Sequence, residues 1–193
     1  MIKRILFLNL CVLLGGLFMI YSAATRTAEN DLPPAGIIQE GDLVFRIGNS
    51  QTSWPIYAVQ AGGWTHVGFV VRDELGRPAI LHSDTPNAPG EPDGVRVEAL
   101  ETYSKHAASI AFYRDASGKG VAAARKALTL VGVPFDNTFE DPKKIYCAEV
   151  ILMGYDAIGV TLPVKHHSLG KLNVFFPNDF STLPGFNKVW PKI

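Results

Sequence analysis

The segment from Tyr146 to Gly159 constrains the fold of this chain most, because its apolar residues repeat with the period of an α-helix. The residues that share one helix face are Cys147, Val150, Ile151, Gly154 and Ile158. A single apolar face predicts a helix packed on the rest of the domain. We expect this helix to start near Tyr146. Cys147 then lies in its opening turns, where unpaired N–H groups and the helix dipole favour a thiolate over a thiol.

Two alternatives weaken the case for a reactive thiol. Unpaired cysteine is among the most buried residue types, and on an apolar helix face it is usually an inert small hydrophobe. A helix that instead begins at Asp141 and Pro142 would move Cys147 into the second turn, where the dipole acts less strongly.

The N-terminus has the pattern of an export signal. Lys3 and Arg4 precede an apolar run over residues 5–20, and small residues at 22–24 match a signal-peptidase site. The apolar run also approaches the length of a bilayer span. An uncleaved segment would therefore tie the protein to the membrane through residues 5–20.

These features predict three parts in the chain. We expect a signal peptide or N-terminal membrane anchor over residues 1–24, a polar linker over residues 25–36, and one domain over residues 37–193. The domain is expected to be periplasmic or secreted. Processing would remove Cys11 and leave Cys147 as the only thiol, and a lone cysteine in an exported chain calls for a reason.

The charge pattern excludes one class of partner. Residues 1–24 contain two basic side chains and no acidic one, so the remaining domain is close to neutral. No basic stripe with interleaved aromatics occurs, which argues against a nucleic-acid partner. A glycine-rich phosphate loop after a strand is also absent from the sequence.

Short apolar runs ahead of the cysteine helix predict an antiparallel sheet. Strands are expected at residues 43–47, 65–71, 78–84, 95–98 and 110–114. Helices are expected at residues 53–61 and 119–131, with a helical turn at 100–107. The tail from residue 162 to residue 193 alternates prolines with aromatics, and we expect it to wrap the core with little regular structure.

Two histidines fall on the hairpin formed by residues 65–84. His66 begins one strand and His82 lies near the end of the returning strand, so their side chains are expected to be neighbours. Cysteine-dependent cleavage of an amide or ester needs a nucleophile, a base and a group that orients the base. Cys147, His66 and His82 supply these three types, with backbone N–H groups around Cys147 as oxyanion donors. Asp84 and Glu98 are alternative orienting groups.

Other interpretations of the same side chains stay open. His66 could be a core histidine bonded to a carbonyl, and the two histidines with Cys147 could bind zinc, although the usual short ligand spacing is absent. His106, His166 and His167 are most simply surface residues. Trp54, Trp64 and Tyr146 are candidates for substrate contact, with Tyr57 beside Trp54, and ordinary core packing is the alternative for these aromatics.

Four short motifs carry a family resemblance. They are residues 41–45 (GDLVF), 65–70 (THVGFV), 80–83 (ILHS) and 146–150 (YCAEV), and residues 176–180 (FPNDF) form a family-like tail. Together they resemble the NlpC-type cysteine hydrolases, and their order is similar to the circularly permuted branch, the YiiX/YebB-like proteins. The resemblance covers roughly residues 38–182. It implies an α+β, circularly permuted papain-like fold, with an antiparallel sheet packed on a cysteine-bearing helix.

The resemblance also implies roles. Cys147 is the expected nucleophile, His66 the base and His82 the third polar residue, a position that holds glutamate in some permuted relatives. The expected activity is that of an exported thiol hydrolase, which cleaves an amide bond in a small peptide or cell-wall fragment through an acyl-enzyme. No cofactor or resident metal is expected. The alternatives are a lipid-directed acyltransferase or thioesterase, and a non-catalytic or metal-loaded binding module.

Overall fold

The computed structural model describes residues 32–49, 53–86, 90–170 and 172–191. The expected signal peptide or anchor and the linker up to residue 31 lie outside these residues. Within the described part of the chain, no helix is long and apolar enough to cross a membrane.

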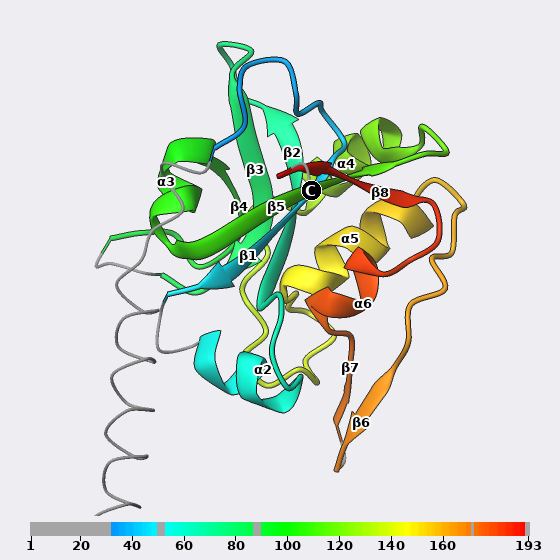
Figure 1. Ribbon diagram of the computed structural model, residues 1–193. Coiled ribbons are helices and arrows are strands. Elements are labelled where there is room, and N and C mark those ends of the chain that lie inside the picture. Colours follow the sequence, from blue (N-terminus) through cyan, green and yellow to red (C-terminus); the bar gives the residue numbers. More distant parts are fainter. Residues whose placement is uncertain (1–31, 50–52, 87–89, 171, 192–193) are drawn as a thin grey trace, which may run out of the picture.

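The domain is built on one six-stranded sheet with the strand order β4-β3-β2-β1-β5-β8, in which every neighbouring pair is antiparallel (Figure 1). Its strands are β1 (Leu43–Gly48), β2 (His66–Arg72), β3 (Pro78–Asp84), β4 (Gly94–Ala99), β5 (Ala107–Asp115) and β8 (Phe186–Trp190). The first five match the strands expected from the sequence. The fold class is α+β with an antiparallel sheet, as predicted.

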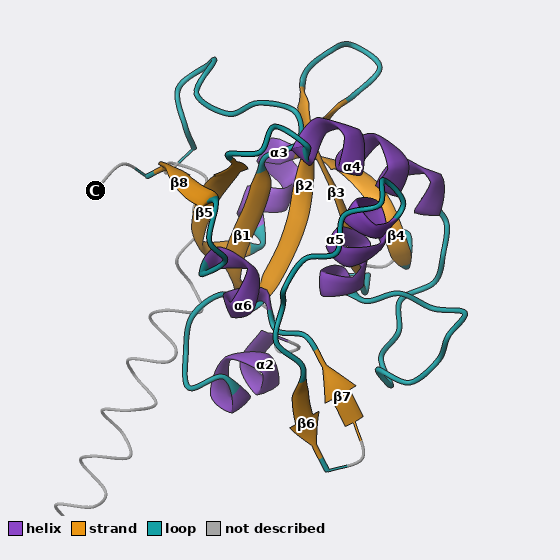
Figure 2. Ribbon diagram, turned by 90° about the vertical axis from the view of Figure 1, so that its right-hand side faces the viewer, coloured by secondary structure: helices purple, strands orange, loops and turns teal. Residues whose placement is uncertain are grey.

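Helices cover both faces of this sheet (Figure 2). One face carries α4 (Gly120–Ala127), α5 (Cys147–Asp156) and α6 (Pro177–Ser181), and the other carries α3 (Leu100–Lys105). The helix α2 (Ser53–Val59) lies at one end of the sheet and has no buried residue. A 3₁₀ turn (Leu128–Leu130) extends α4, and β6 (His167–Leu169) pairs with β7 (Leu172–Val174) as a separate two-stranded sheet.

Two apolar cores follow from the alternation of side chains along the strands. Val67 and Phe69 of β2 face α5 and share a core with Cys147, whereas Val70 faces α3 and shares a core with Tyr103. Every residue of β2 except Arg72 is buried, as expected for a strand covered on both faces. The sheet therefore separates an α5 side from an α3 side.

A glycine lets the cysteine helix approach its neighbours closely. A Cβ at Gly154 would lie 2.8 Å from the carbonyl oxygen of Ala123 and 3.1 Å from the ring of Phe69. A larger residue at this point of the predicted buried face would push α5 away from α4 and the sheet. The other predicted members of that face within the helix, Val150 and Ile151, are fully buried.

The expectation for the tail was wrong. It contains α6, the β6–β7 pair and β8, and β8 extends the main sheet through its pairing with β5. The prolines that obscure the sequence pattern lie outside the strand itself, at Pro184 and Pro191, so they bound β8 without removing its hydrogen bonds.

Candidate active site

His66 and His82 meet across the hairpin of β2 and β3. Nε2 of His66 lies 2.9 Å from Nδ1 of His82, and both side chains are buried. His66 is the first residue of β2, and His82 lies two residues before the end of β3, so antiparallel pairing brings them together. The predicted contact between the two histidines is confirmed.

Gly68 makes room for this contact, and sequence reasoning missed it. A Cβ at Gly68 would lie 2.8 Å from the carbonyl oxygen of Leu81 and 3.0 Å from Cβ of His82. Any larger residue would displace β3 at the point that carries His82. A glycine inside an otherwise apolar strand is the signal that points to such a close approach.

Cys147 is the first residue of α5, as the sequence predicted. The residue before it, Tyr146, is the N-cap, and its backbone N–H donates to the carboxylate of Glu149 at 3.0 Å. This contact fixes the first turn of the helix and hence the position of the thiol. Cys147 is the free cysteine of the described residues, and it is buried.

The expectation that Cys147 is a thiolate in the resting protein was wrong. Burial raises the pKa of the thiol to about 12, and the nearby backbone N–H groups of Val67 and Ala148 lower it only in part. Removing a thiolate from water outweighs the favourable field of the helix N-terminus. The N–H of Val67 belongs to the peptide bond that follows His66, so the sulfur lies against the backbone of the residue pair that carries the expected base.

A buried group of charges surrounds the histidines on the α3 side. The guanidinium of Arg46 pairs with the carboxylate of Asp84, donates to the carbonyl oxygen of Tyr103 at 3.3 Å, and lies 4.3 Å from the centre of the Tyr103 ring. Arg96 donates to the backbone carbonyl of Asp84 at 3.0 Å. With Glu98, the group holds two positive and two negative side chains, so its charges balance.

These surroundings keep both imidazoles neutral. Burial lowers the pKa of His66 well below its usual value, and the positive charge of Arg46 lowers it further. Burial also lowers the pKa of His82, although the carboxylate of Glu98 opposes this shift. A neutral imidazole has one nitrogen with a lone pair, which is what a general base requires.

Of the two alternative orienting carboxylates, Asp84 is held by Arg46 and Glu98 faces His82. Oε2 of Glu98 lies 3.4 Å from Nε2 of His82. Burial acts to raise the pKa of the Asp84 carboxyl, but the positive charges of Arg46 and Arg96 contribute to lowering it, and the pKa stays below its usual value. The carboxylate of Asp84 therefore pairs with Arg46, whereas the carboxylate of Glu98 faces His82.

The side chains of His66, His82 and Asp84 also meet the basic requirements of a metal site. One donor atom from each lies within 4.8 Å of the others, and two imidazoles with a carboxylate are suitable ligands for zinc. The two facing nitrogens would have to separate by about 0.4 Å to leave room for tetrahedral bonds of about 2.0 Å. The donor types fit, but Cys147 is not a member of this group.

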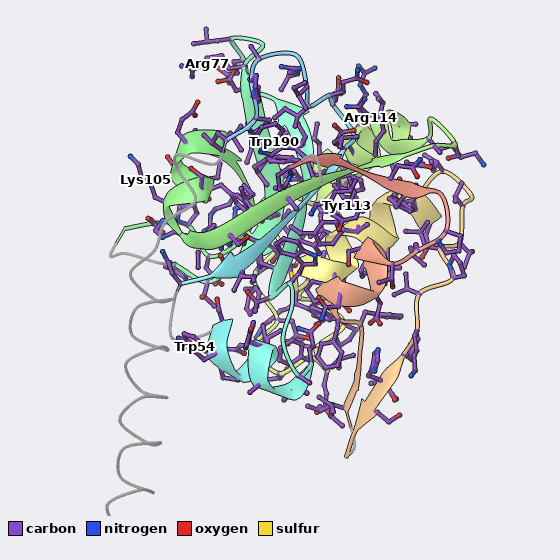
Figure 3. The ribbon with its side chains drawn as sticks, in the orientation of Figure 1. Trp54, Arg77, Lys105, Tyr113, Arg114 and Trp190 are labelled. Atoms are coloured by element: carbon purple, nitrogen blue, oxygen red, sulfur yellow. The ribbon has the colours of Figure 1, made fainter. Side chains whose placement is uncertain are left out.

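The aromatic candidates for substrate contact have packing contacts. Tyr146 is buried, its hydroxyl accepts a hydrogen bond from the N–H of Phe175 at 3.0 Å, and its ring lies 5.0 Å from that of Phe139. Trp64 is half-buried, with its ring 6.0 Å from that of Phe45. Trp54 lies on α2, away from the centre of the domain (Figure 3). Substrate contact by these residues stays a prediction.

The C-terminal part of the chain forms hydrogen bonds close to both His66 and Cys147 in the sequence. The side-chain oxygen of Asn178 accepts from the N–H of Trp64 at 2.6 Å, and its amide nitrogen donates to the carbonyl of Gly62 at 2.8 Å. Trp64 lies two residues before His66. The N–H of Phe175 in turn reaches Tyr146, the residue before Cys147. One segment of the chain thus contacts the residues just before His66 and the residue just before Cys147.

No family model and no curated protein matches this chain. Among solved structures, it is similar to the metalloprotein yiiX from Escherichia coli O157:H7, with a TM-score of 0.65 and 20% sequence identity over 78% of this chain and 95% of that chain. The chain has a YiiX-like fold. In this chain, both histidines lie on the sheet ahead of the cysteine helix.

Proposed function

We propose that the protein is an exported thiol hydrolase with a permuted papain-like fold, in which Cys147 attacks a carbonyl and His66 is the base. One observation carries the proposal. The thiol lies beside the N–H of Val67, the residue that follows His66 in β2, and Nε2 of His66 is already engaged by His82. The free nitrogen of His66, Nδ1, is then the acceptor left for the thiol proton.

The reaction begins from a neutral thiol and a neutral imidazole. As the sulfur of Cys147 bonds to the substrate carbonyl carbon, its proton passes to Nδ1 of His66. Backbone N–H groups in the first turn of α5 stabilise the negative oxygen. His66 then gives its proton to the leaving amine, and water releases the acyl group in a second passage through the same base.

The substrate class rests on the resemblance to NlpC-type hydrolases and on the export signal. We propose an amide in a small peptide or cell-wall fragment as the bond cleaved, in the periplasm or outside the cell. Lipid esters are the other substrate class, because permuted relatives include lipid acyltransferases. Product analysis with wall peptides and with lipid esters separates the two.

The proposal is tested by trapping the acyl-enzyme. An activated ester should add its acyl group to Cys147 in the full-length protein, as measured by peptide mass spectrometry after a short incubation. The variant Cys147→Ala should give no adduct at this site, and His66→Ala should slow its formation by at least about a hundred-fold, since a general base contributes roughly that much. Equal labelling in His66→Ala would refute the proposed dyad.

A metal-loaded binding site is the second candidate. The grouping of His66, His82 and Asp84 favours it, and the YiiX structure is described as a metalloprotein. Against it stands the charge of Arg46, which already neutralises Asp84 and disfavours a further cation. Elemental analysis of the purified protein distinguishes the candidates. A stoichiometric metal that is lost in His82→Ala, together with an unreactive thiol, would favour binding.

A further inference from the structure

Glu98 contacts the histidine pair on the side away from His66. Its Oε2 atom lies 3.4 Å from Nε2 of His82, and the two side chains are 10% and 0% exposed. Neither atom has a hydrogen-bond partner within the described ranges, and each is the polar atom that the other faces. Because buried polar atoms are nearly always paired, each of these two atoms is the natural partner of the other.

The ionisation of Glu98 decides which atom carries the hydrogen. Oε1 of Glu98 lies 3.9 Å from Nη2 of Arg96, and the positive charges of the arginines at positions 96 and 46 favour the ionised carboxylate. An ionised carboxylate can only accept hydrogen bonds. Nε2 of His82 must therefore be the donor in this contact.

The direction of this contact fixes the direction of the hydrogen bond between the two histidines. A neutral His82 with its hydrogen on Nε2 can only accept at Nδ1. Nδ1 faces Nε2 of His66 at 2.9 Å, so Nε2 of His66 must carry the hydrogen of that bond. A neutral His66 protonated at Nε2 has its lone pair on Nδ1. The opposite tautomer would place a hydrogen on Nδ1 and could not take a proton there.

We propose that Glu98 is a positioning residue that fixes the tautomers of His82 and His66 and so keeps Nδ1 of His66 free to accept the proton of Cys147. This inference rests on the proposed function for its role in the reaction, but the tautomers themselves exist without it. A histidine alone as third residue could donate or accept at Nδ1. The carboxylate behind it removes that freedom.

Nitrogen-15 NMR of the histidine rings in the full-length protein near pH 7.5 tests the inference. We expect both His66 and His82 to be protonated at Nε2. In Glu98→Leu, a substantial fraction of His66 should become protonated at Nδ1, and the acylation rate of Cys147 should fall about ten-fold or more. Glu98→Gln keeps an acceptor oxygen and should restore most of the original tautomer and rate. Glu101→Gln, at an exposed position on α3, is the charge-matched control.

If near-UV circular dichroism shows that Glu98→Leu is unfolded, Glu98→Ala replaces it in the test, because it removes the same acceptor with a smaller side chain. Unchanged tautomers in a folded variant that lacks the acceptor would overturn the inference, even if Cys147 proves to be catalytic. If the tautomers shift as expected while wild-type Cys147 forms no acyl adduct, the proposed function fails and the assignment of Glu98 as the tautomer-fixing group stands.

Discussion

At the scale of single residues, the proposed site combines two neutral groups, the thiol of Cys147 and the imidazole of His66, and a buried group of balanced charges surrounds the histidines. Burial keeps the thiol protonated and the imidazole uncharged, as the direction of both pKa shifts indicates. A protein that stores a thiolate must compensate a buried negative charge at all times. In the proposed mechanism, the negative charge arises only while a substrate oxygen is present to receive it.

The buried histidines give the protein a pH-dependent stability. The pKa values of His66 and His82 are lowered in the folded state, whereas a free histidine has a pKa of about 6.5. Below that pH, the unfolded chain binds protons that the folded protein excludes. Their contribution to stability is therefore complete above about pH 6.5 and is lost as the pH falls, by as much as about 1.4 kcal/mol per pH unit for each histidine.

Chemical unfolding between pH 7.5 and 5 measures this loss. His82→Gln should reduce the slope of the unfolding free energy against pH, because it removes one of the groups that titrate on unfolding. Asn173→Ala, which removes no titratable group and changes an exposed position, should leave the slope unchanged. A wild-type unfolding free energy that is constant over this range would contradict the assignment of two buried neutral imidazoles.

At the scale of elements, the start of α5 and the pairing of β2 with β3 set the geometry. Both could be predicted from the sequence. The apolar period from Cys147 onward gave the helix and its buried face, and the spacing of His66 and His82 on a hairpin gave their contact. The thiol's protonation state could not be predicted, because it depends on how completely the folded chain excludes water from the sulfur.

The contact between Glu149 and the N–H of Tyr146 at the start of α5 should contribute measurably to stability and to acylation. Glu149→Ala leaves the N–H of Tyr146 without the carboxylate that it contacts at 3.0 Å. We expect a loss of about 1 kcal/mol in the free energy of unfolding and slower acylation of Cys147. Urea unfolding and adduct mass spectrometry provide the two measurements. Glu149→Gln retains an acceptor oxygen and should recover most of both. If the Ala variant matched the wild type in both respects, Glu149 would have no role in placing the thiol.

At the scale of the whole molecule, the tail completes the domain. The sequence pattern from residue 162 onward did not predict α6 or β8, because their apolar residues stand in short groups between prolines. The tail matters through a long-range contact that no local pattern encodes, because Asn178 on α6 contacts the residues before His66. The contact between Glu98 on the edge strand β4 and His82 is also long-range and could not be predicted from a local pattern.

The two side-chain hydrogen bonds of Asn178 should affect both stability and the acylation of Cys147, although Asn178 lies outside the proposed site. Asn178→Ala removes two hydrogen bonds, to Trp64 and Gly62, and should lower the unfolding free energy by about 1–3 kcal/mol. The acylation rate should also fall, because the chain leading into His66 loses its anchor. Asn173→Ala is the matched control, since its side chain contacts only the exposed Ser168 among the hydrogen bonds described. If both variants acylate at the wild-type rate, the hydrogen bonds of Asn178 have no influence on the site.

The central claim is that His66 takes the proton of Cys147 during attack, and the pH dependence of acylation tests it most directly. The adduct on Cys147 is quantified by mass spectrometry with an activated ester between roughly pH 7 and 9, a range in which a neutral imidazole and a neutral thiol both persist. The account predicts a nearly constant rate in the wild type and a rise of about ten-fold per pH unit in His66→Ala, where only the thiolate reacts. A wild-type rate that rises with pH as steeply as that of His66→Ala would contradict it.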